Sequence, residues 1–225
     1  MVEPRQRKAA LTSRILECVV REGLDYALLR NCNQAASGTA KDLDILVGNN
    51  NRRRFLAVIE TVIEKLPPWE LIQVIENRFG TRVVILHGKE FGLLFDLQSA
   101  IYLAGARIPA EEFLKKGKRR GKTFRKLSPF DHCLCLEIHR RRKPKPEYRE
   151  ELEKIYSRHP GWKDRVEERM IFYRRRYPAT PVRKIRDRVA GIFQRGRALL
   201  PGGLFVVVAG PDGAGKTTTL KVLGK

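Results

Sequence analysis

Lys41-Asp-Leu-Asp-Ile-Leu-Val47 sets two aspartates at alternate positions of an apolar run. Side chains alternate between the two faces of a β-strand, so Asp42 and Asp44 share one face while Leu43 and Ile45 share the other. Two neighbouring carboxylates repel each other, and the pair is costly unless a cation neutralises it. Magnesium prefers oxygen ligands of this kind. The stretch therefore predicts a strand that carries part of a metal site.

A third acid, Asp96, lies inside the apolar run Phe91-Gly-Leu-Leu-Phe-Asp-Leu97. Three acids on adjacent strands can hold metal ions that activate an attacking hydroxyl and stabilise charge on the α-phosphate of a nucleotide. The alternative is structural: Asp42 ends a loop, Asp44 faces water on an edge strand, and Asp96 pairs with an arginine. The spacing alone leaves both interpretations open.

Hydrophobic periodicity predicts the elements around these acids. Helices are expected over 8–22 and over the apolar stripe from Val58 to Leu66, which Pro67 ends. The expected strands cover 26–29, 43–47, 70–76, 82–87 and 91–98. The polar stretch 31–41 is expected to be a loop.

From Ser128 onward the pattern becomes helical. Ser128 can cap a helix whose first turn holds Pro129, and further helices are expected near 147–158 and 162–176. Pro178 marks a boundary, after which a basic amphipathic helix is expected within 179–203. This segment would link two domains or lie on an anionic membrane.

The apolar run 204–209 leads directly into Gly210-Pro-Asp-Gly-Ala-Gly-Lys-Thr217, which matches the phosphate-loop pattern G-x-x-x-x-G-K-[ST]. The glycines let backbone amides turn inward, Lys216 can reach the outer phosphates, and Thr217 can bind magnesium. The residues predicted to bind nucleotide here are Gly210, Asp212, Gly213, Ala214, Gly215, Lys216, Thr217 and Thr218.

This loop resembles that of thymidylate kinase and related nucleoside monophosphate kinases. The resemblance implies ATP as the ligand and places Asp212 near the transferred phosphate. Nine residues follow Lys216, so the acidic metal-binding strand, acceptor pocket and lid of such kinases are not in this chain. We expect 204–225 to be the start of such a domain, with the kinase half incomplete.

Tyr26-Ala-Leu-Leu-Arg-Asn31, followed by the D-x-D stretch, resembles the start of nucleotidyltransferase-fold proteins of the DNA polymerase β superfamily. In that family a helix precedes a short strand and a turn, the D-x-D strand follows, and a third aspartate lies further on, where Asp96 stands. The helical stretch after 128 resembles the partner domain of members such as the aminoglycoside nucleotidyltransferases. The resemblance implies that Asp42, Asp44 and Asp96 bind magnesium and catalyse nucleotidyl transfer.

One departure from that family concerns the turn, which normally offers Gly-Ser or Gly-Gly to the triphosphate. This chain has Arg30 and Asn31 there. Arg30 can contact phosphate through its guanidinium fork, or its bulk can block the approach that glycine permits.

Composition limits the partners without naming one. A formal net charge of +21 predicts attraction to polyanions through the basic segments, although no clear DNA- or RNA-reading motif is present. No apolar stretch is long enough for a membrane span and no secretory signal precedes the first helix, so we expect a cytoplasmic protein. The four cysteines lack zinc-site spacing and are expected to be reduced thiols.

We therefore expect an α/β fold with a mixed nucleotidyltransferase-like sheet. The expected domains are a nucleotidyltransferase-like domain at 1–127, a helical partner at 128–178, a basic linker helix at 179–203 and a truncated phosphate-loop domain at 204–225. The expected function is Mg²⁺-dependent nucleotidyl or phosphoryl transfer from ATP or another nucleoside triphosphate to a small acceptor. The alternatives are a non-catalytic nucleotide- or polyanion-binding module, and a kinase whose N-terminal part is a scaffold.

Overall fold

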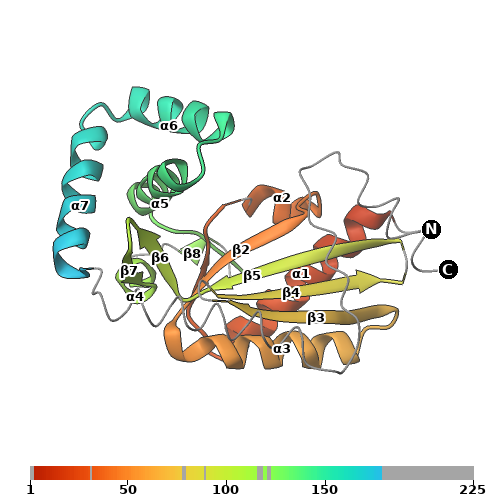
Figure 1. The fold of residues 1–225 in the computed structure, drawn as a ribbon. Helices are drawn as coiled ribbons and strands as arrows, with labels where there is room; N and C mark the ends of the chain where they lie inside the picture. Colours follow the sequence, from red (N-terminus) through yellow and green to blue (C-terminus); the bar gives the residue numbers. More distant parts are fainter. Residues whose placement is uncertain are drawn as a thin grey trace, which may run out of the picture.

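A computed structural model describes residues 3–30, 32–77, 80–88, 90–115, 119–120 and 123–178 (Figure 1). The expected linker helix at 179–203 and the phosphate loop at 204–225 lie outside the described residues.

The centre of the fold is a five-stranded mixed sheet with the order β1-β2-β5-β4-β3. Its strands are β1 (Tyr26–Leu28), β2 (Asp42–Val47), β3 (Trp69–Asn77), β4 (Gly80–His87) and β5 (Phe91–Gln98). β2 and β5 run parallel, and the other neighbouring pairs are antiparallel. The expected mixed α/β sheet is therefore confirmed.

Two helices pack on one face of this sheet, α1 (Pro4–Arg21) and α3 (Arg52–Glu64). Their apolar stripes, which include Leu16 and Ile59, meet the inward side chains of the strands, which include Leu43, Ile45 and Phe95. This cluster is the main core, and it fixes which side chains of β2 and β5 point the other way.

A second core lies on the opposite side of β1 and β2. It joins the hairpin β6 (Ala100–Leu103) and β7 (Ala106–Pro109), the short helix α4 (Glu111–Leu114), and the helices α5 (Pro129–Arg142), α6 (Pro146–Arg158) and α7 (Trp162–Arg176). Leu46 of β2 belongs to this cluster, whereas its neighbours Ile45 and Val47 belong to the first. Figure 1 shows α5–α7, the helical part of the molecule, at one end of the sheet. The division at residue 128 stays a prediction, because this core crosses it.

The remaining short elements are those that sequence patterns did not indicate. They are α2 (Cys32–Ser37), the 3₁₀ turn η1 (Asn49–Asn51), the β6–β7 hairpin, α4, and the pair β8 (Arg119–Arg120) and β9 (Phe124–Arg125). The loop expected at 31–41 is therefore wrong in part, because α2 occupies half of it. This helix was not predictable, since it buries only Ala35 and has no apolar stripe. The β6–β7 turn places both Ala104 (φ 47°) and Gly105 (φ 88°) in the left-handed region, and alanine is an unusual residue there.

Candidate active site

The three acids identified in the sequence lie on one face of two adjacent strands. Asp44 on β2 is the register partner of Asp96 on β5, and these strands are parallel, so both side chains point to the same side. Asp42 lies two residues before Asp44 and shares that face. The intervening Leu43 points into the main core. The expectation that alternation would segregate the acids from the apolar residues agrees with this register.

The environments of the three carboxylates differ sharply. Asp44 is 5% exposed, whereas the Asp42 side chain is 42% exposed and that of Asp96 is 19% exposed. Asp44 therefore does not face water on an edge strand, because β2 lies between β1 and β5. Burying a carboxylate is costly unless a cation or hydrogen bonds replace the water that it loses.

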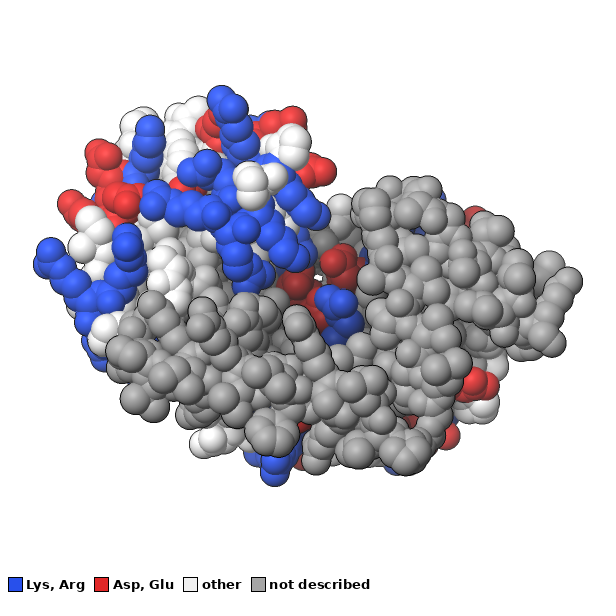
Figure 2. Space-filling view, viewed as in Figure 1, with Lys and Arg blue, Asp and Glu red and all other residues white. Residues whose placement is uncertain are grey.

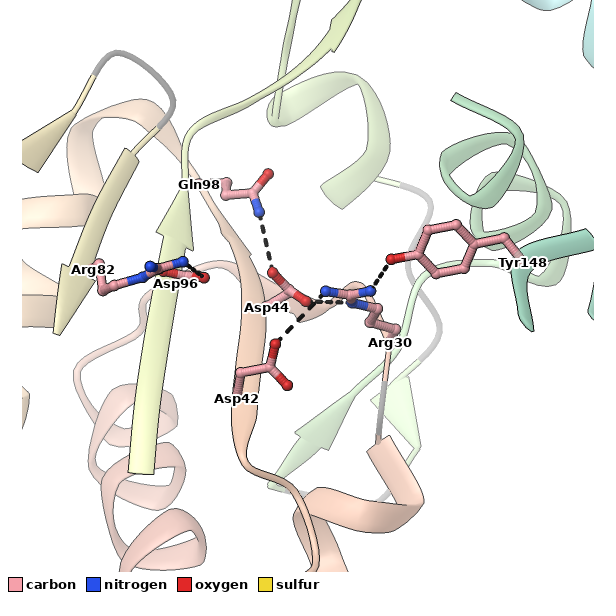
Figure 3. A network of polar contacts seen from close by, with 7 residues as sticks. All are labelled: Arg30, Asp42, Asp44, Arg82, Asp96, Gln98 and Tyr148. Carbon is pink, nitrogen blue, oxygen red and sulfur yellow. Dashed lines mark hydrogen bonds and ion pairs between the residues drawn. The ribbon is translucent and has the colours of Figure 1, made fainter. Parts of the chain in front are cut away.

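Arg30 supplies that positive charge. Its Nε donates a hydrogen bond to Asp44 Oδ2, one Nη lies 3.8 Å from Asp42 Oδ2, and the other Nη donates to the hydroxyl of Tyr148 on α6 (Figure 3). Burial alone would lower the pKa of Arg30, but attraction and hydrogen bonding to Asp44 outweigh burial and raise it. Gln98 adds a weaker contact, with its Nε2 3.4 Å from the other oxygen of Asp44. Arg30 thus ties the acidic strand to the helical part.

Arg82 holds the third acid in the same way. It is the cross-strand partner of Asp96, and its Nε and Nη2 donate to the two carboxylate oxygens at 2.7 and 2.8 Å. Hydrogen bonding to Asp96 is the main reason why the pKa of Arg82 is raised. Figure 3 shows the Asp96 carboxylate turned toward this guanidinium. The structural alternative for Asp96, pairing with an arginine, is therefore observed.

These contacts decide how a metal could fit. Three carboxylates on one face have the oxygen chemistry that Mg²⁺ prefers. However, among the described residues no three His, Cys, Asp or Glu side chains converge closely enough to hold a metal ion. The acids fit Mg²⁺ in donor type and share one face of the sheet, and Mg²⁺ binding would require Arg30 and Arg82 to release them.

Two hollows meet at this network. The smaller, which we call the acidic hollow, has a volume of about 420 Å³ and is lined by all three acids, Arg30 and Arg82 among others. The larger hollow, of about 730 Å³, lies beside α2 and α5. Both are lined by Arg30, Asp42, Lys145 and Tyr148, so the Arg30–Tyr148 contact stands where they meet.

Two histidines of α5 line these hollows, one each. In the larger hollow, His132 Nδ1 lies 3.0 Å from the carbonyl oxygen of Leu29 and Nε2 lies 3.1 Å from Glu151 Oε1. In the acidic hollow, His139 Nδ1 lies 2.9 Å from the carbonyl oxygen of Cys135, and burial lowers the pKa of His139. Both rings are held by hydrogen bonds within the protein.

Sequence reasoning did not single out Arg82, Gln98 or Tyr148. Arg82 carried only a weak signal, because it comes directly before the apolar run of β4, whereas Asp96 lies inside that of β5. Tyr148 carried none, since its contact with Arg30 spans 118 positions of the chain. The predicted phosphate-loop residues Gly210 to Thr218 lie outside the described part of the chain and stay predictions.

Comparison with known proteins adds a distant structural likeness. No family model matches the chain, and no curated protein matches it. Among solved structures, the chain is similar to the antibiotic-resistance factor ANT(2'')-Ia, whose structure was determined in solution, with 14% sequence identity and a TM-score of 0.47 over 86% of this chain and 98% of the other. At this level of similarity, assignment of function depends on the residues of the chain itself.

No helix in the described ranges combines the length and the apolar character that crossing a membrane requires.

Proposed function

We propose that the described part of the chain binds a nucleoside triphosphate and transfers a nucleotidyl group to a small acceptor. The observation that supports this function is the placement of Asp42, Asp44 and Asp96 on one face of adjacent strands, in the acidic hollow, which shares Asp42 with the larger hollow. Group transfer between two substrates requires that both reach the same charged groups, and two adjoining hollows provide that arrangement.

The residues would share the work as follows. Asp42, Asp44 and Asp96 would hold Mg²⁺, which when bound supplies positive charge against the phosphates of the nucleotide. An oxygen of the acceptor attacks the α-phosphorus, the bond from that phosphorus to the β-phosphate oxygen breaks, and pyrophosphate leaves. One carboxylate of the three takes the proton of the attacking group. Arg30 would move from Asp44 to the phosphates, which its guanidinium fork binds well.

The larger hollow is the better place for the nucleotide. Its wall contains Leu28, Leu29, Leu127 and Leu136, which offer apolar surface to a base and sugar. Lys126 at its border offers charge to phosphates. The phosphate loop at 210–218 adds, on sequence grounds, a second site in which Lys216 and Thr217 would bind ATP and Mg²⁺ for phosphoryl transfer.

Calorimetric titration of ATP, with and without Mg²⁺, tests the N-terminal site. The full-length chain should carry Lys216→Ala, so that the phosphate loop does not contribute. We expect Mg²⁺-dependent binding that Asp44→Asn weakens about tenfold or more, because a charged ligand contact is lost. Asp25→Asn is the matched control, since Asp25 is an exposed aspartate paired with Arg125 on another part of the surface.

A second candidate is a non-catalytic module that binds nucleotides or other polyanions. It is favoured by the observation that Arg30 and Arg82 already neutralise the acids. For such a module, ATP would bind equally without metal. Asp44→Asn would then leave binding unchanged or strengthen it by freeing Arg30, and that result would contradict the transferase.

A further inference from the structure

The connection between α5 and α6 is a short, stiff segment with two lysines, Lys143-Pro-Lys-Pro146. Each lysine precedes a proline, which disfavours the helical conformation, and both are extended, with φ and ψ of −138° and 92° at Lys143 and −113° and 139° at Lys145. Proline also fixes its own φ. The segment therefore presents its two ammonium groups from a backbone with little freedom to rearrange.

These lysines border the acidic hollow. Lys143, Lys145 and Arg142 from the last turn of α5 line it together with the three acids of the sheet. Figure 2 shows basic side chains gathered on the helical part, facing acidic side chains at the centre of the view. The hollow thus has the three carboxylates with Arg30 and Arg82 on its sheet side, and further cations on its helical side.

The charge of this hollow is not balanced once its internal pairs are formed. Arg30 pairs with both Asp44 and Asp42, and Arg82 pairs with Asp96, so these two cations leave one of the three carboxylate charges uncompensated. The two ammonium groups of Lys143 and Lys145 outnumber that remaining negative charge. Within the described ranges, no carboxylate lies within ion-pair distance of the ammonium group of Lys143 or Lys145, and Lys145 lies 5.9 Å from the centre of the Tyr148 ring. An entering ligand therefore meets net positive charge.

The hollow between α5, α6 and α7 provides an internal comparison. It is also rich in arginine, but Arg140 and Arg141 bind Glu137 at 2.7 and 2.8 Å, and Arg149 binds Glu153 at 2.9 Å. There the arginine side chains are paired within the protein. Lys143 and Lys145 differ, because no carboxylate of the described residues pairs with them.

We propose that the acidic hollow binds a small acceptor that carries a phosphate group, with Lys143 and Lys145 as the phosphate ligands. The acceptor role rests on the proposed function, in which the nucleotide occupies the larger hollow. A volume of about 420 Å³ suits a small molecule. The phosphate of the acceptor stays bound to the lysines while another of its oxygens attacks the α-phosphorus. A polycationic acceptor would be repelled by the same lysines.

Binding of inorganic phosphate tests this site directly, because phosphate presents the proposed recognition group alone. It is titrated into the full-length Lys216→Ala chain and into the same chain with Lys143→Gln and Lys145→Gln. We expect the double change to weaken phosphate binding about tenfold or more, since charge-assisted hydrogen bonds are lost. Lys154→Gln with Lys163→Gln removes the same charge from exposed positions elsewhere and should change binding less than about twofold.

A second titration distinguishes the two sources of phosphate. It is carried out with a non-hydrolysable ATP analogue and Mg²⁺ at saturation. Undiminished phosphate binding, and an unchanged analogue affinity in the Lys143→Gln/Lys145→Gln chain, would support a separate acceptor site. Competition between phosphate and analogue, with the double change weakening both, would assign the lysines to the phosphates of the nucleotide and overturn the proposal.

Failure of the proposed function would look different. In that case the analogue would not bind, and the phosphate titration alone would show whether Lys143 and Lys145 bind phosphate. Phosphate binding equal in the double variant and its Lys154/Lys163 control would overturn it.

Discussion

At the scale of single residues, Arg30 is the cation that pairs with the buried carboxylate of Asp44. Removing one partner of a buried ion pair leaves the other charge uncompensated, and Asp44 is 5% exposed. We expect Arg30→Gln to lower the free energy of unfolding by about 3 kcal/mol, and Arg30→Lys to lower it less. Urea unfolding followed by circular dichroism measures both.

Arg82→Gln is the comparison for this change. Arg82 is 48% exposed and the Asp96 side chain 19% exposed, so water can replace more of the lost interaction. We expect a cost of about 1 kcal/mol or less. Equal costs for the two changes would show that burial of Asp44 does not set the strength of the Arg30 contact.

His139 should make stability depend on pH. Burial lowers its pKa below the ordinary value of 6.5, so the unfolded chain takes up a proton at a higher pH than the folded protein. Stability should therefore fall as the pH drops below about 6.5, with a slope of at most about 1.4 kcal/mol per pH unit for one proton. Between pH 8 and pH 5, the melting temperature should fall less for His139→Gln than for His159→Gln, the same change at an exposed histidine.

Individual site residues were predictable where a charge interrupts an apolar strand. Asp42, Asp44 and Asp96 stood out for that reason, and the register of β2 and β5 places them on one face. Their partners were less visible, because the ion pairs depend on which strands and helices become neighbours. Arg30 was noticed as a departure from a glycine turn, but its contact with Tyr148 depends on the packing of α6 against the sheet.

At the scale of elements, Ser128 defines the start of α5. Its Oγ accepts a hydrogen bond from the backbone N–H of Asp131 at 3.1 Å and donates to the Asp131 carboxylate at 2.6 Å. Loss of an N-cap typically costs about 1 kcal/mol, so Ser128→Ala should lower the melting temperature by several degrees. Ser157→Ala, at an exposed serine near the end of α6, should have little effect.

The longer elements were largely predictable, because each combines a periodic apolar face with a clear stop. α3 ends before Pro67 and α5 begins after Ser128. The three long strands, β3, β4 and β5, lie where apolar residues alternate with polar ones or form a continuous run. Short elements were not predictable for the opposite reason. α2 and the β6–β7 hairpin are stabilised by neighbours from other parts of the chain rather than by a local pattern.

At the scale of the whole molecule, the second core joins the sheet to the helical part. Leu46 from β2 packs in the same cluster as Leu134 of α5 and Met170 of α7. We therefore expect both parts to unfold together. The two tryptophans report on them separately, since Trp69 lies on β3 and Trp162 at the start of α7.

Single-tryptophan variants measure this coupling. Trp69→Phe leaves a reporter in the helical part, and Trp162→Phe leaves one in the sheet. Urea transitions followed by fluorescence should have the same midpoint as the transition that circular dichroism gives for each variant. If the fluorescence of Trp162 changed at a lower urea concentration than that of Trp69, the boundary predicted at residue 128 would separate two units that unfold independently.

β2 has one further consequence, which concerns how substitutions accumulate in descendants of this chain. Its odd positions, Leu43, Ile45 and Val47, are fixed by one core, whereas Asp42 and Asp44 at even positions meet the counter-ion Arg30 and, in the proposed function, would meet ligands. A new specificity can therefore arise at even positions without repacking the main core. Insertion or loss of one residue would turn the side chains of the strand to the opposite face, which would place the aspartates in the core and the apolar residues in the hollow. This strand should therefore vary by replacement and keep its length.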